Sequence, residues 1–302
     1  MAERYKINRK FILNFAKKIG YDPNKNHPKL LSKEDEAYIV SMYNSMSGSK
    51  LAKDFNVSTS KIHQIWMQNG LSGKVNRTYY FNENYFEIID TEDKAYFLGL
   101  LASDGCIYNR NKNKQQNTIN ITLQKCDKHI LDSFMEYINS DKPISSCVIN
   151  GREYASIEQS SDKMCRDLMN YGMGFNKTDK CIWPYKLEKD MDMMRHFIRG
   201  YFDGDGCISH NLHKNSLHSV NISIAGYYKN LKLFKYFLNN NGIKSILAED
   251  KREYKGEDKF GALVFTNKKE KVKFLHYIYD DSNIYLDRKF KLAQKFIALC
   301  EK

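Results

Sequence analysis

One short pattern occurs twice in this chain, and it constrains the fold more than any other feature. Residues 97–107 read Phe-Leu-Gly-Leu-Leu-Ala-Ser-Asp-Gly-Cys-Ile, and residues 198–208 read Ile-Arg-Gly-Tyr-Phe-Asp-Gly-Asp-Gly-Cys-Ile. The acids before the final Gly-Cys-Ile, Asp104 and Asp205, are 101 residues apart. Each copy predicts a helix that ends at Asp-Gly and continues into a strand. Two matched helices, each ending in a carboxylate, indicate one site built from two halves.

Glycines within the predicted helices need a physical reason, because Gly costs a helix about 1 kcal/mol relative to Ala. Small residues let two helix backbones approach closely, so Gly99 and Gly200 are predicted to lie where the two helices pack together. Gly105 and Gly206 stand where the end of a helix favours a residue in the left-handed conformation.

Asp104 and Asp205 are then expected at the negative ends of two helix dipoles, where a carboxylate is disfavoured. Two such carboxylates close together repel each other unless a cation lies between them. Oxygen ligands with room for water and phosphate suit Mg²⁺. The repeat therefore predicts metal ions shared by the two acids, an arrangement suited to phosphodiester hydrolysis. The alternative is that both acids are ordinary polar helix ends.

Both motifs resemble the LAGLIDADG motif of homing endonucleases, and the resemblance covers about residues 94–302. The eighth motif position, the metal-binding acid of that family, maps to Asp104 and Asp205. The sixth position is Ala102 in the first copy, where the family usually has an acid, and Asp203 in the second. Two motifs in one chain are similar to the single-chain, pseudosymmetric class, which implies a monomer.

The resemblance implies an α+β fold with two pseudosymmetric α/β halves, 94–190 and 191–302, each with an antiparallel, saddle-like sheet. It also implies a sequence-specific endonuclease that cuts both strands of DNA with Mg²⁺, for which Mn²⁺ can substitute, and leaves short 3′ overhangs. Members of this family carry a lysine near each cleavage centre. The best matches are Lys180 and Lys289, with Lys177 and Arg288 as close competitors.

The repeat extends beyond the motif at the same offset. Asn-Ile-Thr-Leu at 120–123 aligns with Asn-Ile-Ser-Ile at 221–224, and an amphipathic helix is expected after each. A hairpin over 144–158 should turn at Asn150-Gly151, which is a strong signal for a type I′ turn. A second hairpin is expected over about 245–265, with a charged tip.

Polar loops connect the first two predicted strands of each half. Residues 109–117 contain no apolar residue, and 210–218 are nearly as polar. Amide and basic side chains can contact base edges and phosphates, whereas a solvated hairpin tip is the alternative. The residues of the two halves expected to contact DNA are Arg110, Lys112, Lys114, Gln115, Gln116, Arg152, His213, Lys214, Lys251 and Arg252.

Positive charge is concentrated at the start of the chain. The net charge is +12, and residues 1–75 hold 13 Lys and Arg against 6 Asp and Glu. Such an excess favours a polyanionic partner, here double-stranded DNA. We therefore expect a separate DNA-binding module over 1–75 and a linker over 76–93. Lys74 and Arg77, at the start of this tether, are expected to contact phosphates.

The N-terminal module has the spacing of a helix-turn-helix. Ser32 is the expected N-cap of one helix, and further helices are predicted at about 8–19, 49–55 and 59–69. This pattern resembles the helix-turn-helix of recombinases and sigma factors, although a plain three-helix bundle can share it. The residues expected to face the major groove are Ser58, Thr59, Ser60, Lys61 and Gln64.

Other features limit the class of protein. Seven widely spaced cysteines without a Cys-x-x-Cys pair predict reduced, buried thiols in an intracellular protein, located in the cytoplasm, the nucleoid or an organelle. No stretch approaches the roughly 18 apolar residues of a membrane span, so no membrane partner is expected. The chain lacks the terminal residues of an intein and is expected to be free-standing or intron-encoded. Two alternatives remain open: a non-catalytic DNA-binding regulator and an intron RNA maturase.

Overall fold

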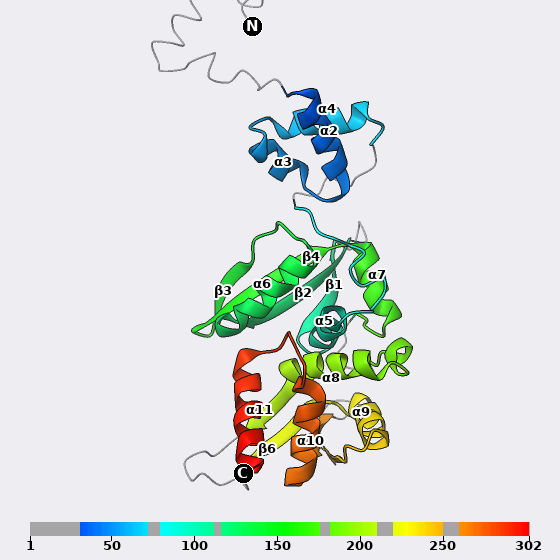
Figure 1. Ribbon diagram of the computed structural model, residues 1–302, viewed down its shortest axis with the longest axis vertical. Coiled ribbons are helices and arrows are strands. Elements are labelled where there is room, and N and C mark those ends of the chain that lie inside the picture. Colours follow the sequence, from blue (N-terminus) through cyan, green and yellow to red (C-terminus); the bar gives the residue numbers. More distant parts are fainter. Residues whose placement is uncertain are drawn as a thin grey trace, which may run out of the picture. The chain divides into compact units, whose positions relative to one another are not determined.

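The computed structural model describes residues 31–71, 79–111, 116–175, 182–209, 220–249 and 260–301. These residues form two compact units, each described by itself below. The first contains the described residues up to Phe81 together with Asn139–Lys142, and the second contains Asn82–Ile138 and the described residues from Pro143 onward (Figure 1).

The first unit is a small helical cluster. Its helices are α2 (Lys33–Ser41), the 3-10 turn η1 (Met42–Asn44), α3 (Gly48–Asp54) and α4 (Thr59–Gln68). Ser32 caps α2 as predicted: its hydroxyl accepts from the Asp35 amide at 3.0 Å, and the Asp35 carboxylate accepts from the Ser32 amide at 3.0 Å. This reciprocal pair satisfies two backbone donors that the first turn would otherwise leave without a partner.

The second unit combines helices with two sheets. Its helices are α5 (Glu92–Ser103), α6 (Lys128–Tyr137), α7 (Asp162–Asn170), α8 (Met191–Asp205), α9 (Tyr228–Asn240), α10 (Lys268–Tyr279) and α11 (Asp287–Cys300), with the short turns η2 (Lys125–Asp127) and η4 (Tyr185–Leu187). The strands of the first sheet are β1 (Gly105–Asn111), β2 (Gln116–Gln124), β3 (Ser145–Ile149) and β4 (Arg152–Ser160). Those of the second are β5 (Gly206–Ser209), β6 (Asn221–Tyr227), β7 (Ile246–Glu249) and β8 (Phe260–Phe265).

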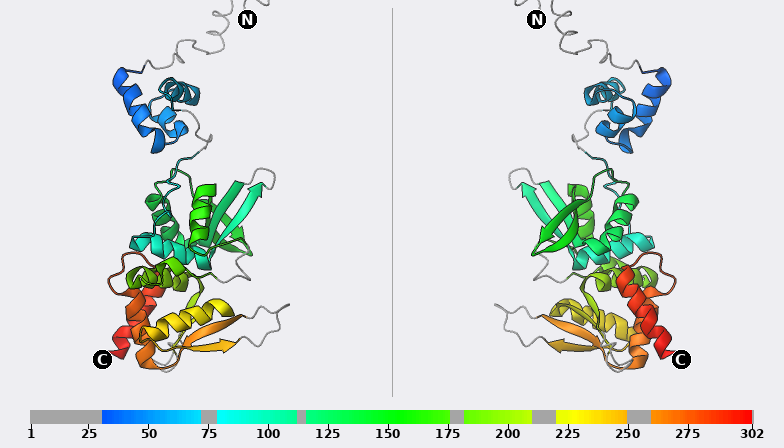
Figure 2. Two further views of the ribbon diagram at one scale, coloured as in Figure 1. Left: turned by 90° about the vertical axis from the view of Figure 1, so that its right-hand side faces the viewer. Right: turned by 90° about the vertical axis from the view of Figure 1, so that its left-hand side faces the viewer.

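Both sheets are antiparallel and share one topology. The strand orders are β1-β2-β4-β3 and β5-β6-β8-β7, so each repeat builds the same four-stranded sheet. Within this unit the strands of both sheets lie on one side, and α10 and α11 lie on the other (Figure 2). The predicted α+β architecture with two matched halves is therefore confirmed.

The first predicted hairpin turns where expected. Asn150 and Gly151 have φ values of 50° and 75°, and Ile149 pairs with Arg152 on either side of them. Positive φ at both central residues defines a type I′ turn, whose twist matches that of the flanking strands. The tip of the second predicted hairpin lies outside the described residues.

Strand pairing departs from the 101-residue offset. Gly105 pairs with Ile121 in the first sheet, whereas Gly206 pairs with Ile224 in the second. The second strand has therefore shifted by two residues along its partner. Because side chains alternate between the two faces, an even shift keeps the apolar residues on the buried face.

Part of the expected linker is packed rather than extended. Tyr85 and Phe86 are buried, and the Phe86 ring stacks on Phe134 of α6 at a centroid distance of 6.2 Å. Ile89 is buried as well. The prediction that the whole of 76–93 is a tether is wrong for these residues, because their aromatic and branched side chains fill the core beside α6.

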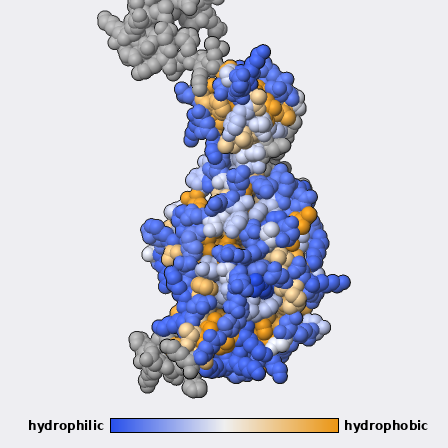
Figure 3. Space-filling view, in the orientation of Figure 1, coloured by the Kyte–Doolittle hydropathy of each residue, from blue (hydrophilic) through white to orange (hydrophobic). Residues whose placement is uncertain are grey.

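Two further expectations concern the surface. No helix in the described parts of the chain is long and apolar enough to cross a membrane. The thiols of Cys106, Cys126, Cys147 and Cys207 are exposed, and among the described cysteines only Cys165 is fully buried. The expectation of buried thiols is therefore wrong for most of them. Figure 3 shows a largely hydrophilic surface on the face viewed, with small, separate apolar patches.

Candidate metal and DNA site

The two motif helices, α5 and α8, pack directly against each other through their glycines. A Cβ atom on Gly99 would lie 2.0 Å from the Phe197 carbonyl oxygen, and one on Gly200 would lie 1.9 Å from the Tyr96 carbonyl oxygen. Any side chain at either position would overlap the backbone of the other helix. The reciprocal contacts confirm the predicted close approach and place a local two-fold relation at this point.

Gly105 and Gly206 are glycines for a different reason from the one predicted. Gly206 has φ −79° and ψ 155°, and neither glycine is among the described residues with positive φ. A Cβ on Gly206 would lie 2.2 Å from the Phe202 ring, and one on Gly105 would lie 2.6 Å from the Leu101 side chain. The prediction of a left-handed conformation is wrong, because what excludes a side chain here is the preceding helical turn.

Asp104 and Asp205 stand at the adjoining ends of α5 and α8. Asp104 is the exposed C-cap residue of α5, and Asp205 is the half-buried last residue of α8. A Cβ on Gly204 would lie 1.9 Å from the Ser103 hydroxyl and 3.1 Å from the Asp104 carboxylate. The Asp104 side chain thus lies against the last turn of the other motif helix, next to Asp205.

This arrangement suits a cation on chemical grounds. Two carboxylates at the negative ends of two helices repel each other and the helix dipoles, and a bound divalent ion would offset this repulsion. No group of three or more Asp, Glu, His or Cys side chains that could hold a metal occurs among the described residues. Asp104 and Asp205 could therefore hold an ion only if water or phosphate oxygens completed its shell, which is usual for Mg²⁺.

Lys289 of α11 reaches the same end of α8. Its ammonium group donates to the carbonyl oxygens of Phe202 (2.8 Å), Asp203 (2.7 Å), Gly204 (3.2 Å) and Gly206 (2.5 Å). A cation at the C-terminal end of a helix is stabilised by the helix dipole and by the free carbonyl groups there. The Lys289 side chain is thus fixed at the end of α8.

Burial and charge act in opposite directions on Lys289. Burial lowers its pKa to about 8, although the nearby carboxylates of Asp203, Asp104 and Asp205 oppose the change. Both motif acids are thus close enough to influence this ammonium group. Lys180 and its competitor Lys177 lie outside the described residues, so no equivalent can be placed in the first repeat.

The competitor Arg288 points elsewhere. Its Nε donates to both carboxylate oxygens of Asp127, at 3.1 and 3.0 Å, and Asp127 is buried. An arginine engaged in this ion pair has a structural partner of its own. Between the two candidates in this segment, the geometry favours Lys289.

The acid at the sixth motif position, Asp203, is not directed at the metal site. It is fully buried, and its carboxylate accepts hydrogen bonds from the hydroxyls of Tyr96 (2.9 Å) and Tyr279 (2.7 Å) and from the Leu286 amide (2.8 Å). Burial raises the pKa of Asp203, although these hydrogen bonds and the charge of Lys289 favour its ionised form. Ala102 occupies the matching position in the first repeat and is also buried.

The solvent face of the first sheet is polar. Paired positions across it carry Cys106, Asn120 and Glu158 in one row and Thr122, Ser156 and Ser145 in the next. Asn120 donates to the Ser156 hydroxyl at 3.0 Å, and the Tyr108 hydroxyl donates to Glu158 at 2.7 Å. This face offers hydrogen-bond donors and acceptors held in fixed positions.

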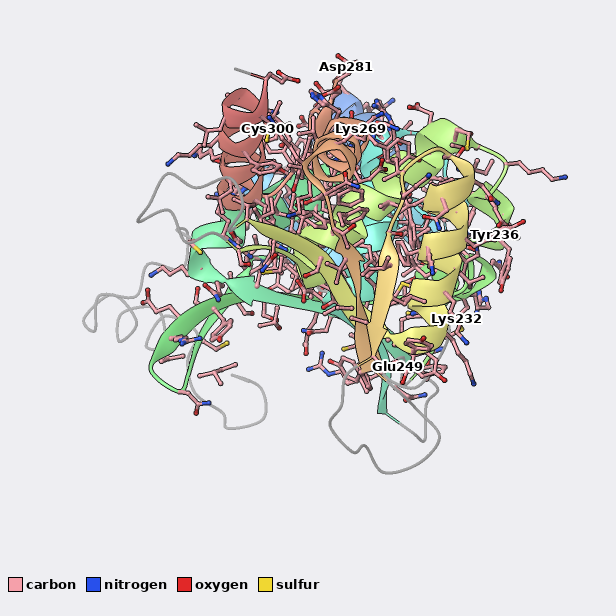
Figure 4. The ribbon with its side chains drawn as sticks, turned by 90° about the horizontal axis from the view of Figure 1, so that it is seen from below. Lys232, Tyr236, Glu249, Lys269, Asp281 and Cys300 are labelled. Carbon is pink, nitrogen blue, oxygen red and sulfur yellow. The ribbon has the colours of Figure 1, made fainter. Side chains whose placement is uncertain are left out.

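The described part of the solvent face of the second sheet is more apolar. One row carries Cys207, Ser223, Val264 and Ile246, and the next carries Ala225, Ala262 and Ala248. Figure 4 places Glu249 at the strand side of the unit, with Lys269, Asp281 and Cys300 at the opposite, helical side and Lys232 and Tyr236 pointing outward from α9. The sheets and helices thus offer chemically different surfaces.

Few of the predicted DNA contacts of the two repeats can be placed. Arg110 is exposed on β1 with its guanidinium 3.8 Å from Glu158, and Arg152 is exposed at the start of β4. Gln116 opens β2. The other predicted residues lie outside the described parts of the chain: Lys74, Arg77, Lys112, Lys114, Gln115, His213, Lys214, Lys251 and Arg252.

The first unit has the predicted helix-turn-helix spacing. Ser58 caps α4 by accepting from the Lys61 amide at 3.2 Å, and Asn56 in the turn has φ 52°. Thr59, Ser60 and Gln64 are exposed on α4. Lys61 is half-buried, with its ammonium 4.0 Å from Glu36. Thr59, Ser60 and Gln64 therefore share the outward side of α4, an arrangement that a recognition helix and a plain three-helix bundle would both show.

The core of this unit differs partly from the prediction. Ala52, Ile62 and Ile65 are buried as expected, and Phe55 and Val57 are partly buried against them. Ile39, Leu51 and Trp66 were missed. The Trp66 indole donates to the Ile39 carbonyl oxygen at 2.9 Å, and the apolar i, i+4 relation of Ile62 and Trp66 is the signal that could have revealed it.

The charge of the module is also distributed differently from the simplest expectation. Residues 31–71 contain four lysines and four acids, so the described helices are neutral overall. The excess of positive charge in 1–75 lies in 1–30 and at Lys74, outside the described residues. The charge argument for DNA binding therefore does not rest on the helix-turn-helix itself.

Comparison with known proteins agrees with the motif. Residues 192–279 match the family model described as a LAGLIDADG-like domain. The second repeat is therefore similar to a LAGLIDADG-like domain. A search of curated protein sequences found no significant match.

Among solved structures, this chain is similar to the homing endonuclease I-DmoI in complex with DNA and Ca, at 18% identity and a TM-score of 0.48, over 71% of this chain and 99% of that one. It is also similar to the meganuclease I-SmaMI bound to uncleaveable DNA, at 11% identity and a TM-score of 0.46, over 70% of this chain and 91% of that one.

Proposed function

We propose that this protein is a site-specific endonuclease that hydrolyses both strands of double-stranded DNA with divalent metal ions. The observation that carries the proposal is that Asp104 and Asp205 stand at the adjoining ends of α5 and α8, two helices whose glycines allow close packing. A protein that only bound DNA would have no need for two carboxylates at this point.

The roles of the chain's own groups follow from their positions. Asp104 and Asp205 would hold Mg²⁺, or Mn²⁺ in its place, with water and phosphate oxygens completing the shell. When bound, such an ion makes its water more acidic and stabilises charge on the phosphate. Lys289 would place a positive charge at the same helix end, where it can offset charge that develops in the reaction. Lys180 would serve the other half-site.

The two sheets would supply the DNA-binding surface. The fixed amides and hydroxyls of the first sheet suit hydrogen bonds to base edges. The alanines, Val264 and Ile246 of the second sheet suit apolar contacts, such as those with thymine methyl groups. A monomer with unlike halves would read an asymmetric target, and closely spaced cuts across the minor groove would leave short 3′ overhangs.

The N-terminal unit would extend the target at one end. Thr59, Ser60 and Gln64 would face the major groove from α4, and the basic residues of 1–30 with Lys74 and Arg77 would contact phosphates. Loss of residues 1–75 should then shorten the footprint on DNA and weaken binding at a fixed salt concentration. If the full-length protein and the protein without residues 1–75 gave equal footprints, a purely structural three-helix cluster would be the better account.

A plasmid cleavage assay tests the proposal. Supercoiled plasmid would carry the sequence formed when the DNA on either side of the gene is joined without it. We expect a single linear product in Mg²⁺ and none in EDTA, with the ends mapped by run-off sequencing. Specific binding without breaks in Mg²⁺ or Mn²⁺ would indicate a DNA-binding regulator instead. Promotion of intron splicing in the absence of cleavage would indicate a maturase.

A further inference from the structure

The segment that joins α10 to α11 is held by polar side chains from the two motif helices. We call Asn283–Leu286 the strap. Its Asn283 amide and side-chain Nδ2 donate to the Glu92 carboxylate at 2.7 and 2.8 Å. Arg199 Nε donates to the Ile284 carbonyl oxygen at 2.9 Å. The strap thus touches charged groups of both α5 and α8.

The third tie is made by Asp203. Its carboxylate accepts the Leu286 amide at 2.8 Å, at the last residue before α11. The strap is therefore hydrogen-bonded to the motif helices at Asn283, Ile284 and Leu286. Ile284 and Leu286 are themselves buried in the core, whereas Asn283 is exposed.

The anchoring side chains also bind one another. Arg199 Nη2 donates to Glu92 at 2.6 Å and Arg199 Nη1 donates to the Ile278 carbonyl oxygen at 3.0 Å. Tyr96 and Tyr279 hydrogen-bond Asp203. Arg199 and Asp203 are both 0% exposed. Such buried charges are satisfied, but they are an inefficient way to stabilise a core.

The first repeat shows that packing does not require these charges. Leu98 and Ala102 occupy the positions that match Arg199 and Asp203, and both are buried. Apolar residues therefore fill the equivalent space in the other half. Arg199 and Asp203 of the second repeat differ from these apolar residues in that they also hold the strap.

The strap leads directly into α11. Lys289 lies three residues after Leu286, and its amide donates to the Leu286 carbonyl oxygen at 3.0 Å. The same residue sends its ammonium group to the end of α8, beside the motif acids. Asp203 thus fixes the strap at Leu286, while its own carbonyl oxygen accepts from Lys289. A displaced strap would move Lys289 away from this point.

We infer that Glu92, Arg199 and Asp203 are positioning residues that hold the strap so that Lys289 stays at the end of α8. The inference rests on the proposed nuclease function for its consequence in catalysis. Because the anchors act on Lys289, and because Leu98 and Ala102 stand in the first repeat where the second has Arg199 and Asp203, loss of the anchors should affect one DNA strand more than the other.

Strand-resolved cleavage tests this consequence. Asp203→Asn removes the negative charge and replaces one of the two acceptor oxygens with an NH2 donor. The hydrogen bonds that Asp203 accepts from Tyr96, Tyr279 and the Leu286 amide can then no longer all be kept as they are, so the strap should loosen. We expect one strand to be cut roughly 10- to 100-fold more slowly, the range typical of groups that orient an active-site residue, and nicked plasmid to accumulate. Asn283→Ala removes only the hydrogen bond from the Asn283 side chain to Glu92. It should slow the same strand by a smaller factor, roughly two- to tenfold. Equal slowing of both strands would overturn the inference.

A second measurement does not depend on activity. An amine-reactive reagent followed by mass spectrometry reports the accessibility of Lys289, which should be protected in the wild type. Asp203→Asn and Asn283→Ala should both raise its labelling, whereas Asn240→Ala, at an exposed position ending α9, should not. Unchanged labelling of Lys289 in Asn283→Ala would overturn the inference even if Asp203→Asn failed to fold. If the wild type cut no DNA, the proposed function would fail, and labelling would still decide whether the strap positions Lys289.

Discussion

The two repeats agree where their backbones touch and differ where their side chains fill space. Gly99 and Gly200 make reciprocal contacts with the opposite helix, and Asp104 and Asp205 stand at the ends of those helices. A few positions away, the buried Leu98 of the first repeat matches the buried Arg199 of the second. Where two helix backbones touch, only glycine fits. A buried volume, in contrast, can be filled by several combinations of side chains.

The sheets show the same divergence at the surface. The first presents hydrogen-bonded Asn120, Thr122 and Ser156, and the second presents Ala225, Ala262 and Val264 at paired positions. The two sheets share one strand order, while their exposed side chains differ. Each sheet could therefore contact a different half of the proposed DNA target. We use the term two-fold frame for the packed pair α5 and α8 together with the sheet topology that both halves share. The comparison therefore distinguishes residues that maintain this frame from residues that make the two halves different.

The largest effect should come from the motif acids, which the comparison treats as equivalent. Asp104→Asn and Asp205→Asn should each abolish cleavage of both strands, because each removes a charge from a shared metal site. DNA affinity should change little, since phosphate contacts by Lys and Arg supply most of it. Plasmid cleavage and gel-shift measurements in Mg²⁺ check this. A variant that still nicks one strand at the wild-type rate would show that the ions are not shared.

The second-largest effect should come from Gly99 and Gly200, where the motif helices cross. Substitution of either glycine should lower the free energy of unfolding by a similar amount. Gly99→Ala and Gly200→Ala each force a Cβ to within about 2 Å of a carbonyl oxygen, so each should lower the free energy of unfolding by about 3 kcal/mol or more. Urea denaturation measures the loss. Gly174→Ala, where a Cβ would meet no atom within 4 Å, should change stability by less than about 0.5 kcal/mol. A tolerated change at one crossing glycine would break the local symmetry.

A transplanted acid tests whether the two interiors are really different. Ala102→Asp copies the second repeat into the first, but it buries a carboxylate without the ties that Tyr96, Tyr279 and Leu286 give Asp203. We expect a loss of several kcal/mol in the free energy of unfolding. Ala248→Asp, at an exposed position of β7, is the matched control. A stable Ala102→Asp protein would mean that the first repeat contains a hidden polar environment.

The last effect concerns the pH dependence of stability and is specific to the second repeat. Burial lowers the pKa of His196 to about 4, from an ordinary value of 6.5, helped by the adjacent charge of Arg199. Between these values the unfolded chain binds the proton and the folded chain does not, so this group makes stability fall as pH falls from 6.5 toward 4. The slope should reach about 1.4 kcal/mol per pH unit.

The comparison of wild type with His196→Gln isolates this contribution. The His196 Nδ1 atom lies 2.7 Å from Arg199 Nη1, and the glutamine oxygen can accept the same hydrogen bond without titrating. The difference in unfolding free energy between the two proteins should therefore change over this pH window and be constant above it. Parallel curves throughout would show that His196 is not neutral in the folded state.

Much of the frame could be predicted from the sequence. The repeat located the motif helices and their acids, Asn150-Gly151 located a tight turn, and Ser32 and Ser58 located two helix starts. These signals are local, because each depends on backbone geometry or on a hydrogen bond within a few residues. Lys289 was identified through family resemblance, and its position at the end of α8 agrees with that assignment.

What the sequence by itself determined is the two-fold frame: small residues at a fixed spacing admit a helix crossing, and the acids that follow must then meet at its end. The tertiary structure alone decided how the halves differ. Tyr85 and Phe86 joined the core, the second sheet shifted by two residues, and Asp203 turned inward to bind Tyr279 and the strap. Each of these outcomes depends on partners far away in the chain, and the burial that selects them exists only after the elements have packed.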